Sequence, residues 1–311
     1  GLGKVQRLAA DLGSVFNPCL FKPQYCAHCL LTRRVVECET LMSHCESALE
    51  RLSALLEFSL NSLPRPYGRV FVRHVVLRYP LRTLRGLWAH CLTFRAGQRE
   101  YRLLFRDDDD AFVERAAGDG ERLLVGTGFC QKPRHLNGKG YDCPAGRFNH
   151  DCLYLASLDL DSSSAEQIHS ACLDCSVRVL GHAALEAGAS FVVLTSALDI
   201  AHDVLLPALE KRRFARVLFA VCPYSVEPMS LALLTCGVGG YVFRYHTGFC
   251  TNYAQWLRAD GGDKPERTTL SRASSTRLTG LLKAIAARRL LSGCARPTRY
   301  EQVDHVFRPC W

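Results

Sequence analysis

The chain has 311 residues, of which 48% are hydrophobic and 22% are charged, and its formal net charge is +9. This composition excludes a disordered tail, and the length allows one large domain or two smaller ones. No run approaches the roughly 18 uncharged apolar residues that a membrane-spanning helix needs, so we expect no contact with a membrane. The basic excess is compatible with nucleic-acid binding, and equally with offsetting the charge of thiolate clusters.

Sixteen cysteines are the main compositional signal. Disulfide frameworks belong to small secreted domains that lack a core, whereas this chain has ample Leu, Val and Ala to build one. We therefore favour metal ligation over disulfides or scattered buried thiols. The first residues, Gly1–Lys4, lack an initiator Met and an apolar signal core, which indicates a processed or cut start and favours a cytoplasmic location.

Residues 1–63 are expected to form a cysteine-rich, mainly helical region. The Cys26-x-x-Cys29 spacing allows two thiolates to grip one metal from a tight turn. Cys38 and Cys45 are seven residues apart in a predicted helix at Val36–Leu60, so they share a face and could complete a tetrathiolate site. Alternatively, these two pack as small apolar residues.

Residues 64–125 are expected to form a basic α+β segment. Val70–Leu77 is predicted to be a strand, with arginines before, within and after it. Together with Trp88, these arginines could hold a nucleic acid, although a solvated surface is the favoured interpretation. The Asp107–Asp110 run is interpreted as a solvated turn without chemistry.

A long loop between Gln131 and His150 follows a predicted strand at Leu123–Val125. Long loops inside domains are often functional, and cysteines flank and interrupt this one, which favours an ordered loop pinned by a metal. The proposed ligands are three thiols, with a histidine or an exogenous group as the fourth; inert thiols are the alternative. The residues concerned are Cys130, Cys143, Cys152 and His150.

Residues 126–260 are expected to form an α/β domain built on a parallel, Rossmann-like sheet with flanking helices. Short β-branched or aromatic runs predict buried strands, and helical spacing lies between them. The predicted strands are Leu153–Leu160, Phe191–Thr195, Val217–Val221 and Gly240–Arg244, with helices at Ser176–Ala187, Ala197–Arg213 and Ser225–Cys236.

Four thiols are predicted to meet at the carboxyl edge of this sheet, where α/β folds bind ligands. Cys222 directly follows one strand, and Cys250 lies in the loop after the next. Cys172 and Cys175 open a helix, whose N-terminus should lower their thiol pKa values. Cys152 would begin the Leu153–Leu160 strand, about 25 Å from this edge, so we expect it to belong to a separate site.

These four thiolates suit an iron–sulfur cluster, probably of the 4Fe-4S type, or a structural zinc ion. Placement at a ligand-binding edge favours the cluster. A metal-free redox dithiol of Cys172 and Cys175 is a further possibility. After this domain, residues 261–311 are predicted to be a polar loop and a docked basic helix at Arg272–Leu291.

The motifs Cys172-x-x-Cys175, Ala220-Val-Cys222-Pro223 and Gly248-Phe-Cys250, with Gly181 and Gly188, resemble an uncharacterised prokaryotic cysteine-rich family catalogued as domain of unknown function 116. The resemblance covers roughly Gly126–Asp260. It implies an α/β domain suspected of iron–sulfur binding and encoded beside radical enzymes and lipoate-attachment proteins. It implies a cluster role for Cys172, Cys175, Cys222 and Cys250, but no established reaction.

The sequence thus favours an iron–sulfur protein that serves electron transfer, sulfur handling or maturation for a partner enzyme, possibly a radical enzyme. A zinc-stabilised module that binds nucleic acid or another partner through its arginines is the first alternative. A metal-free thiol/disulfide oxidoreductase is the second.

Overall fold

A computed structural model describes residues 53–93, 100–105, 108–134, 142–161 and 168–311. The chain divides into two compact units, Gly1–Glu50 and Arg51–Trp311, and every described residue belongs to the second. The predicted ligands Cys26, Cys29, Cys38 and Cys45 therefore lie outside the described residues. Of the predicted helix at 36–60, residues from 53 onward are described, and residues 53–62 are helical.

The second unit is built on a mixed sheet of eight strands in the order β1-β5-β4-β2-β3-β8-β7, with β6 paired to β5. Its four central strands are parallel, and the flanking strands pair antiparallel to them. The strands are β1 (Tyr101–Leu103), β2 (Leu123–Gly128), β3 (Ser190–Leu194), β4 (Arg216–Val221), β5 (Gly239–Thr247), β6 (Thr269–Leu270), β7 (Arg299–Val303) and β8 (Val306–Cys310).

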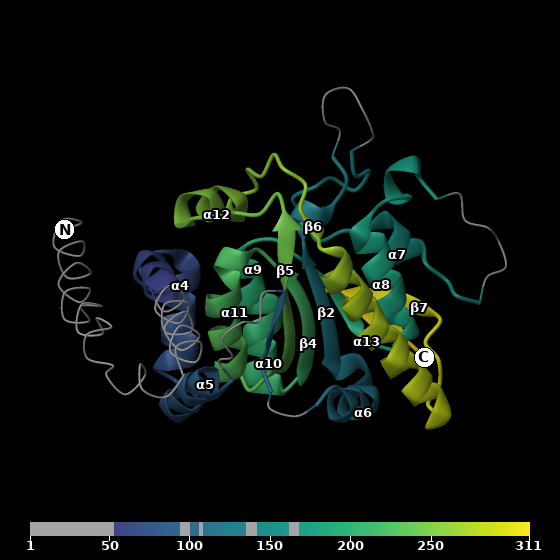
Figure 1. The fold of residues 1–311 in the computed structure, drawn as a ribbon, viewed down its shortest axis with the longest axis horizontal. Coiled ribbons are helices and arrows are strands. Elements are labelled where there is room, and N and C mark those ends of the chain that lie inside the picture. Colours follow the sequence, from purple (N-terminus) through teal and green to yellow (C-terminus); the bar gives the residue numbers. More distant parts are fainter. Residues whose placement is uncertain (1–52, 94–99, 106–107, 135–141, 162–167) are drawn as a thin grey trace, which may run out of the picture. The chain divides into compact units, whose positions relative to one another are not determined.

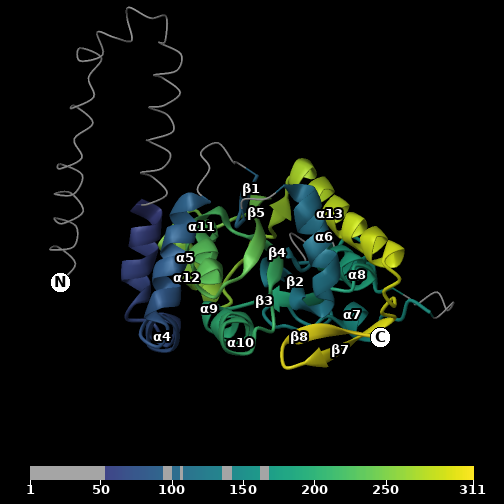
Figure 2. The ribbon, with the colours of Figure 1, turned by 90° about the horizontal axis from the view of Figure 1, so that it is seen from below.

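Helices cover both faces of this sheet (Figures 1 and 2). One face carries α6 (Asp109–Asp119), α7 (Leu153–Ser157), α8 (Ser176–Glu186) and α13 (Arg272–Leu291). The other carries α5 (Pro80–Leu92), α9 (Ala197–Ile200), α10 (Leu206–Lys211) and α11 (Pro223–Thr235). The helices α4 (Pro66–Phe71) and α12 (Tyr253–Asp260) complete the set. None of the described helices is both long and apolar enough to cross a membrane.

The α/β class and the central strands are confirmed. β3, β4 and β5 match the predicted strands to within a few residues, and the predicted C-terminal helix coincides with α13. Ser196 and Asp199 form a capping box at the start of α9, as their spacing predicts. Buried, β-branched runs thus identified the strands correctly where the chain lies inside the sheet.

Two predicted strands are wrong. Val70–Leu77 is helical, comprising the end of α4 and a π turn at Val72–Val76. There Phe71 and Val75, four residues apart, turn to the same core, and this helical spacing outweighs the β-propensity of the valines. Leu153–Leu160 begins with the short helix α7, because Leu155 and Leu158, three residues apart, are both buried. The C-terminal hairpin β7–β8 was not predicted.

The segments 64–125, 126–260 and 261–311 share this one compact unit. The expected boundary after Val125 falls inside β2. Residues after Asp260 contribute β6, β7 and β8 to the sheet, beside β5 and β3. The sheet is therefore assembled from strands of all three segments.

A buried ion network fixes α11, the helix that follows Cys222, to the sheet. The Glu227 carboxylate lies 2.6 Å from a guanidinium nitrogen of Arg102 in β1 and 3.7 Å from one of Arg244 in β5. His90 of α5 lies 3.5 Å from the same carboxylate. Burial, helped by Arg102, lowers the pKa of His90 to about 4, so His90 is neutral at pH 7.

We expect Glu227→Gln to lower the free energy of unfolding by about 3–5 kcal/mol, because it leaves buried arginine charges without their counterion. Urea denaturation of the reduced protein measures this change. The matched control is Glu210→Gln, which breaks a more exposed ion pair with Arg78 and should change the free energy by less than about 1 kcal/mol. Equal effects of the two substitutions would contradict a structural role for this network.

Candidate metal centre

Three thiols meet where the strand order reverses, at the carboxyl ends of β2, β4 and β5. Cys130 lies in the short 3₁₀ turn directly after β2, and Cys222 is the residue between β4 and α11. Cys250 follows β5 and precedes α12. β2 and β4 are adjacent and parallel, but β3 separates them in the chain, so their carboxyl ends form a topological switch point. We call these cysteines the three-thiol group.

Hydrogen bonds between the thiols link the three-thiol group. Cys222 makes hydrogen bonds with both Cys130 and Cys250, which raise its own pKa and lower those of its partners. The pKa of Cys250 falls to about 7, with Lys264 contributing through its charge and a hydrogen bond. The Thr268 hydroxyl donates to Cys130 Sγ at 3.1 Å. Cys222 therefore holds its proton more firmly than Cys130 and Cys250, whose pKa values these hydrogen bonds lower.

Four further thiols gather beside the start of α8. Cys172 ends a 3₁₀ turn, and Cys175 is the N-cap of that helix. Cys143 and Cys152 come from the loop after β2. In addition to burial, Cys143 raises the pKa values of Cys172 and Cys175, and Cys175 and Cys143 raise the pKa of Cys152, so the four thiols are electrostatic neighbours. We call Cys143, Cys152, Cys172 and Cys175 the four-thiol group.

Burial governs the protonation of the four-thiol group. It raises the pKa of Cys152 to about 11 and also raises the pKa values of Cys172 and Cys175. The prediction that the helix N-terminus lowers the last two is therefore wrong. Backbone N–H groups of Val177 and Arg178 do stabilise the Cys175 thiolate, but the loss of solvent outweighs them. A bound cation would displace these protons.

The loop that carries Cys143 and Cys152 is held in place by two cationic side chains. Lys132 is 1% exposed, and its ammonium donates to the carbonyl oxygens of Gly146, Asn149 and Asp151 at 3.1, 2.9 and 2.8 Å. Arg147 donates to carbonyl oxygens of Cys130, Lys264, Pro265 and Glu266. The described part of this loop is thus fixed by hydrogen bonds to its own backbone and to the chain after α12.

The structure redistributes the thiols that the sequence grouped. Of the predicted central set, Cys222 and Cys250 join Cys130, whereas Cys172 and Cys175 join Cys143 and Cys152. The prediction that Cys152 lies far from Cys175 is wrong, because it assumed an extended strand after Cys152 where the chain forms the short helix α7. His150, the predicted fourth ligand of Cys130, Cys143 and Cys152, instead lies against His305.

The two thiol groups are neighbours. Two consecutive residues connect them, because Arg267 donates to the carbonyl oxygen of Asp174, beside Cys175, while Thr268 bonds to Cys130. Cys130, Cys152 and Cys175 also belong to one hydrophobic cluster, against which Cys222 packs. Cys175 and Cys222 thus contact the same hydrophobic cluster, although they belong to different thiol groups. None of the eleven described cysteines forms a disulfide.

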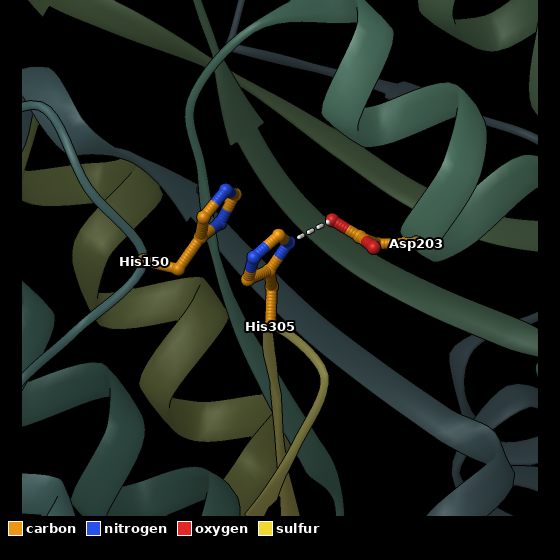
Figure 3. Close-up of side chains that lie close together, drawn as sticks. All are labelled: His150, Asp203 and His305. Carbon is orange, nitrogen blue, oxygen red and sulfur yellow. Dashed lines mark hydrogen bonds and ion pairs between the residues drawn. The ribbon is translucent and has the colours of Figure 1, made fainter.

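A separate polar group lies at the end of β3 (Figure 3). The rings of His150 and His305 stack at 3.9 Å, and His305 Nδ1 lies 2.7 Å from a carboxylate oxygen of Asp203. Both nitrogens of His150 already have partners, namely the Val193 carbonyl at 2.9 Å and the Thr195 hydroxyl at 3.0 Å. Binding a metal here would break one of these bonds, which makes this group a poorer candidate than the thiols.

Among the described residues, His150, Asp203 and His305 form the one group of three or more ligand atoms that all lie within 4.8 Å of one another. Neither thiol group is that compact. A single zinc ion, with bonds of about 2.3 Å, would hold four sulfurs about 3.8 Å apart, so zinc binding would require the sulfurs of the four-thiol group to move closer together.

Comparison with known proteins adds no relative. No family model matches the chain, and no curated protein or solved structure matches it either. The resemblance to the cysteine-rich family therefore stays a prediction. Sequence reasoning also missed the residues that position the thiols: Lys132, Arg147, Lys264, Arg267 and Thr268. The basic composition of the loop after β2 was their one visible signal.

We expect Lys132→Ala to lower the free energy of unfolding by about 3 kcal/mol, because several carbonyl oxygens in a buried place lose their donor. The same change should speed alkylation of Cys152 by iodoacetamide, followed by mass spectrometry. Lys283→Ala, at an exposed position of α13, is the matched control and should change neither quantity. An unchanged alkylation rate at Cys152 would show that Lys132 does not hold this loop.

The ionisation of Cys250 is also testable. In the reduced, metal-free protein its alkylation rate should reach half its maximum near pH 7, since the thiolate is the reactive form and its pKa is about 7. Lys264→Gln should move this midpoint to higher pH, because it removes the positive charge that stabilises the thiolate. The exposed Cys91 serves as the internal control, and its rate should not respond to the substitution. A midpoint that stays in place would exclude Lys264 from this role.

Proposed function

We propose that this protein binds iron–sulfur clusters of the 4Fe-4S type and serves electron transfer, sulfur handling or maturation for a partner enzyme, such as a radical enzyme. The observation that carries the proposal is the gathering of seven free thiols, as a group of four and a group of three, at one edge of one sheet. Thiolates are the usual ligands of such clusters, which supply one-electron transfer when bound.

The residues around the sulfurs fit a cluster. The four-thiol group provides a complete set of cysteine ligands, and the three-thiol group leaves one ligand position open. Iron–sulfur clusters with thiolate ligands carry negative charge, and Lys132, Lys264 and Arg267 supply positive charge beside the sulfurs. The low-polarity environment of Cys130, Cys152 and Cys175 limits access of water.

The arrangement of the two groups supports a role in moving electrons. The four-thiol group lies among α8, the loop after β2 and the hydrophobic cluster, whereas the three-thiol group lies at the ligand-binding switch point. The short segment from Lys264 to Thr268 contacts both groups. Lys264 and Thr268 make hydrogen bonds to Cys250 and Cys130 of the three-thiol group, and Arg267 donates to the carbonyl oxygen of Asp174, beside Cys175 of the four-thiol group. A centre of four cysteines next to one with an open position is suited to pass electrons to a bound molecule.

The alternatives have weaker support. A structural zinc ion also accepts four thiolates, but it needs a tighter set of sulfurs. The nucleic-acid interpretation relied on exposed arginines, yet Arg78 pairs with Glu210, and Arg82 donates to the Leu209 carbonyl. A redox dithiol of Cys172 and Cys175 requires an easily ionised thiol, whereas burial raises the pKa values of both.

Anaerobic purification followed by iron, zinc and acid-labile sulfide analysis tests the proposal. Iron and sulfide should be present together, with visible absorption that is lost on oxidation. Replacing Cys172 and Cys175 by Ser should remove the iron bound by the four-thiol group, and replacing Cys222 and Cys250 by Ser should remove the iron bound by the three-thiol group. The two losses of iron should add when the substitutions are combined. Cys91→Ser and Cys236→Ser, outside both groups, are matched controls and should leave the iron content unchanged.

Colourless protein with stoichiometric zinc would replace the proposal by the zinc-stabilised module. Protein with neither metal, in which a Cys172–Cys175 disulfide titrates reversibly, would replace it by a thiol oxidoreductase. Loss of all iron from either pair of substitutions would show that the seven thiols do not form two independent centres.

A further inference from the structure

A partly open cavity of about 360 Å³ adjoins the three-thiol group. Its floor is formed by the carboxyl ends of the parallel strands, with Gly128, Leu194 and Val221 at their ends. Its walls come from residues 53–62 and from α4, α9, α11 and α12. This volume lies in the range of small-molecule sites, and the switch point of an α/β sheet is where such sites form.

The lining of the cavity is apolar because its polar side chains bond to the protein. The Tyr67 hydroxyl contacts Ser62 Oγ at 3.2 Å and the Tyr253 hydroxyl at 2.9 Å. The Ser59 hydroxyl donates to the Leu55 carbonyl at 2.7 Å, and the Tyr245 hydroxyl donates to the Ala220 carbonyl at 2.7 Å. The surface that remains for a ligand is carbon, including the aromatic rings of Phe58 and Trp256, which pack edge to face at 4.8 Å.

The charge of the lining selects the class of ligand. Among the described residues that line the cavity, Asp260 is the one charged side chain, and it accepts the Ala197 N–H at 2.6 Å. No cationic side chain of the described lining is available to an anionic ligand. The sulfurs of Cys130, Cys222 and Cys250 lie at the same wall and would repel an anion when ionised.

We propose that this cavity binds a neutral, apolar small molecule, one end of which lies against the thiols of Cys130, Cys222 and Cys250. The proposal extends the proposed function by naming the class of molecule that the three-thiol group meets. It rests on the shape and the lining of the cavity, so it can be tested on protein that carries no metal.

The test uses the full chain, reduced and metal-free, with the fluorescent apolar amine aminoanthracene as the probe. The probe should bind and be displaced by butanol, hexanol and octanol with an affinity that rises about fourfold per methylene group, the increment expected for burying each one. Octanol should also slow the alkylation of Cys250, which lines the cavity and ionises near pH 7, without slowing that of Cys91, which does not line it.

Two substitutions fill the cavity from different helices: Ala197→Trp in the first turn of α9 and Ser225→Phe in the first turn of α11. Each should weaken binding of the probe at least tenfold. Ala254→Trp, an exposed position in the first turn of α12 that does not line the cavity, is the matched control and should bind normally. Circular dichroism confirms that each variant is folded, and protection of Cys250 in the unaltered protein requires no variant.

Absence of probe binding, an affinity that does not depend on chain length, or equal alkylation of Cys250 with and without octanol would each overturn the proposal. Any of these results leaves the iron–sulfur assignment standing, because no metal takes part. Conversely, probe binding and Cys250 protection in a protein that never contains iron would support the cavity while removing the iron–sulfur assignment.

Discussion

The parallel pairing of β2 with β4 is the constraint on which the candidate centre depends. Their register sets Thr127 opposite Ala220, so both strands end at the same level and Cys130 and Cys222 follow within three residues. A slip by one residue would turn alternate side chains to the other face and separate the thiols. Gly126 permits this register, since a Cβ there would lie 2.7 Å from the Phe219 ring of β4.

The second constraint is the balance of charge at this edge. Seven thiols in a largely buried region would be unfavourable as thiolates without nearby cations. The chain supplies cationic side chains that also have structural tasks: Lys132 and Arg147 hold the loop after β2, and Lys264 lowers the pKa of Cys250. The same side chains that order the loops therefore also place positive charge beside the sulfurs.

The cavity and the three-thiol group share a wall, and this arrangement distinguishes the three-thiol group from the four-thiol group. Cys130, Cys222 and Cys250 line the cavity, whereas Cys143, Cys152, Cys172 and Cys175 do not. A molecule in the cavity would therefore meet the three-thiol group and not the four-thiol group.

The sequence by itself determined the α/β class and the central strands, because these follow from local periodicity. It also placed Cys222 and Cys250 directly after β4 and β5. Its placement of Cys172 and Cys175 relied on a strand at Leu153–Leu160, where the chain instead begins with the helix α7. Only the tertiary structure decided which thiols meet. A short helix follows Cys152 where a strand was expected, so Cys152 lies closer to Cys175 than an extended chain would allow. Hydrogen bonds from Lys132 and Arg147 also hold the loop between β2 and α7 against the rest of this edge of the sheet. The local sequence pattern predicts whether each segment forms a helix or a strand. Which distant residues come into contact depends on packing and charge that several segments supply together.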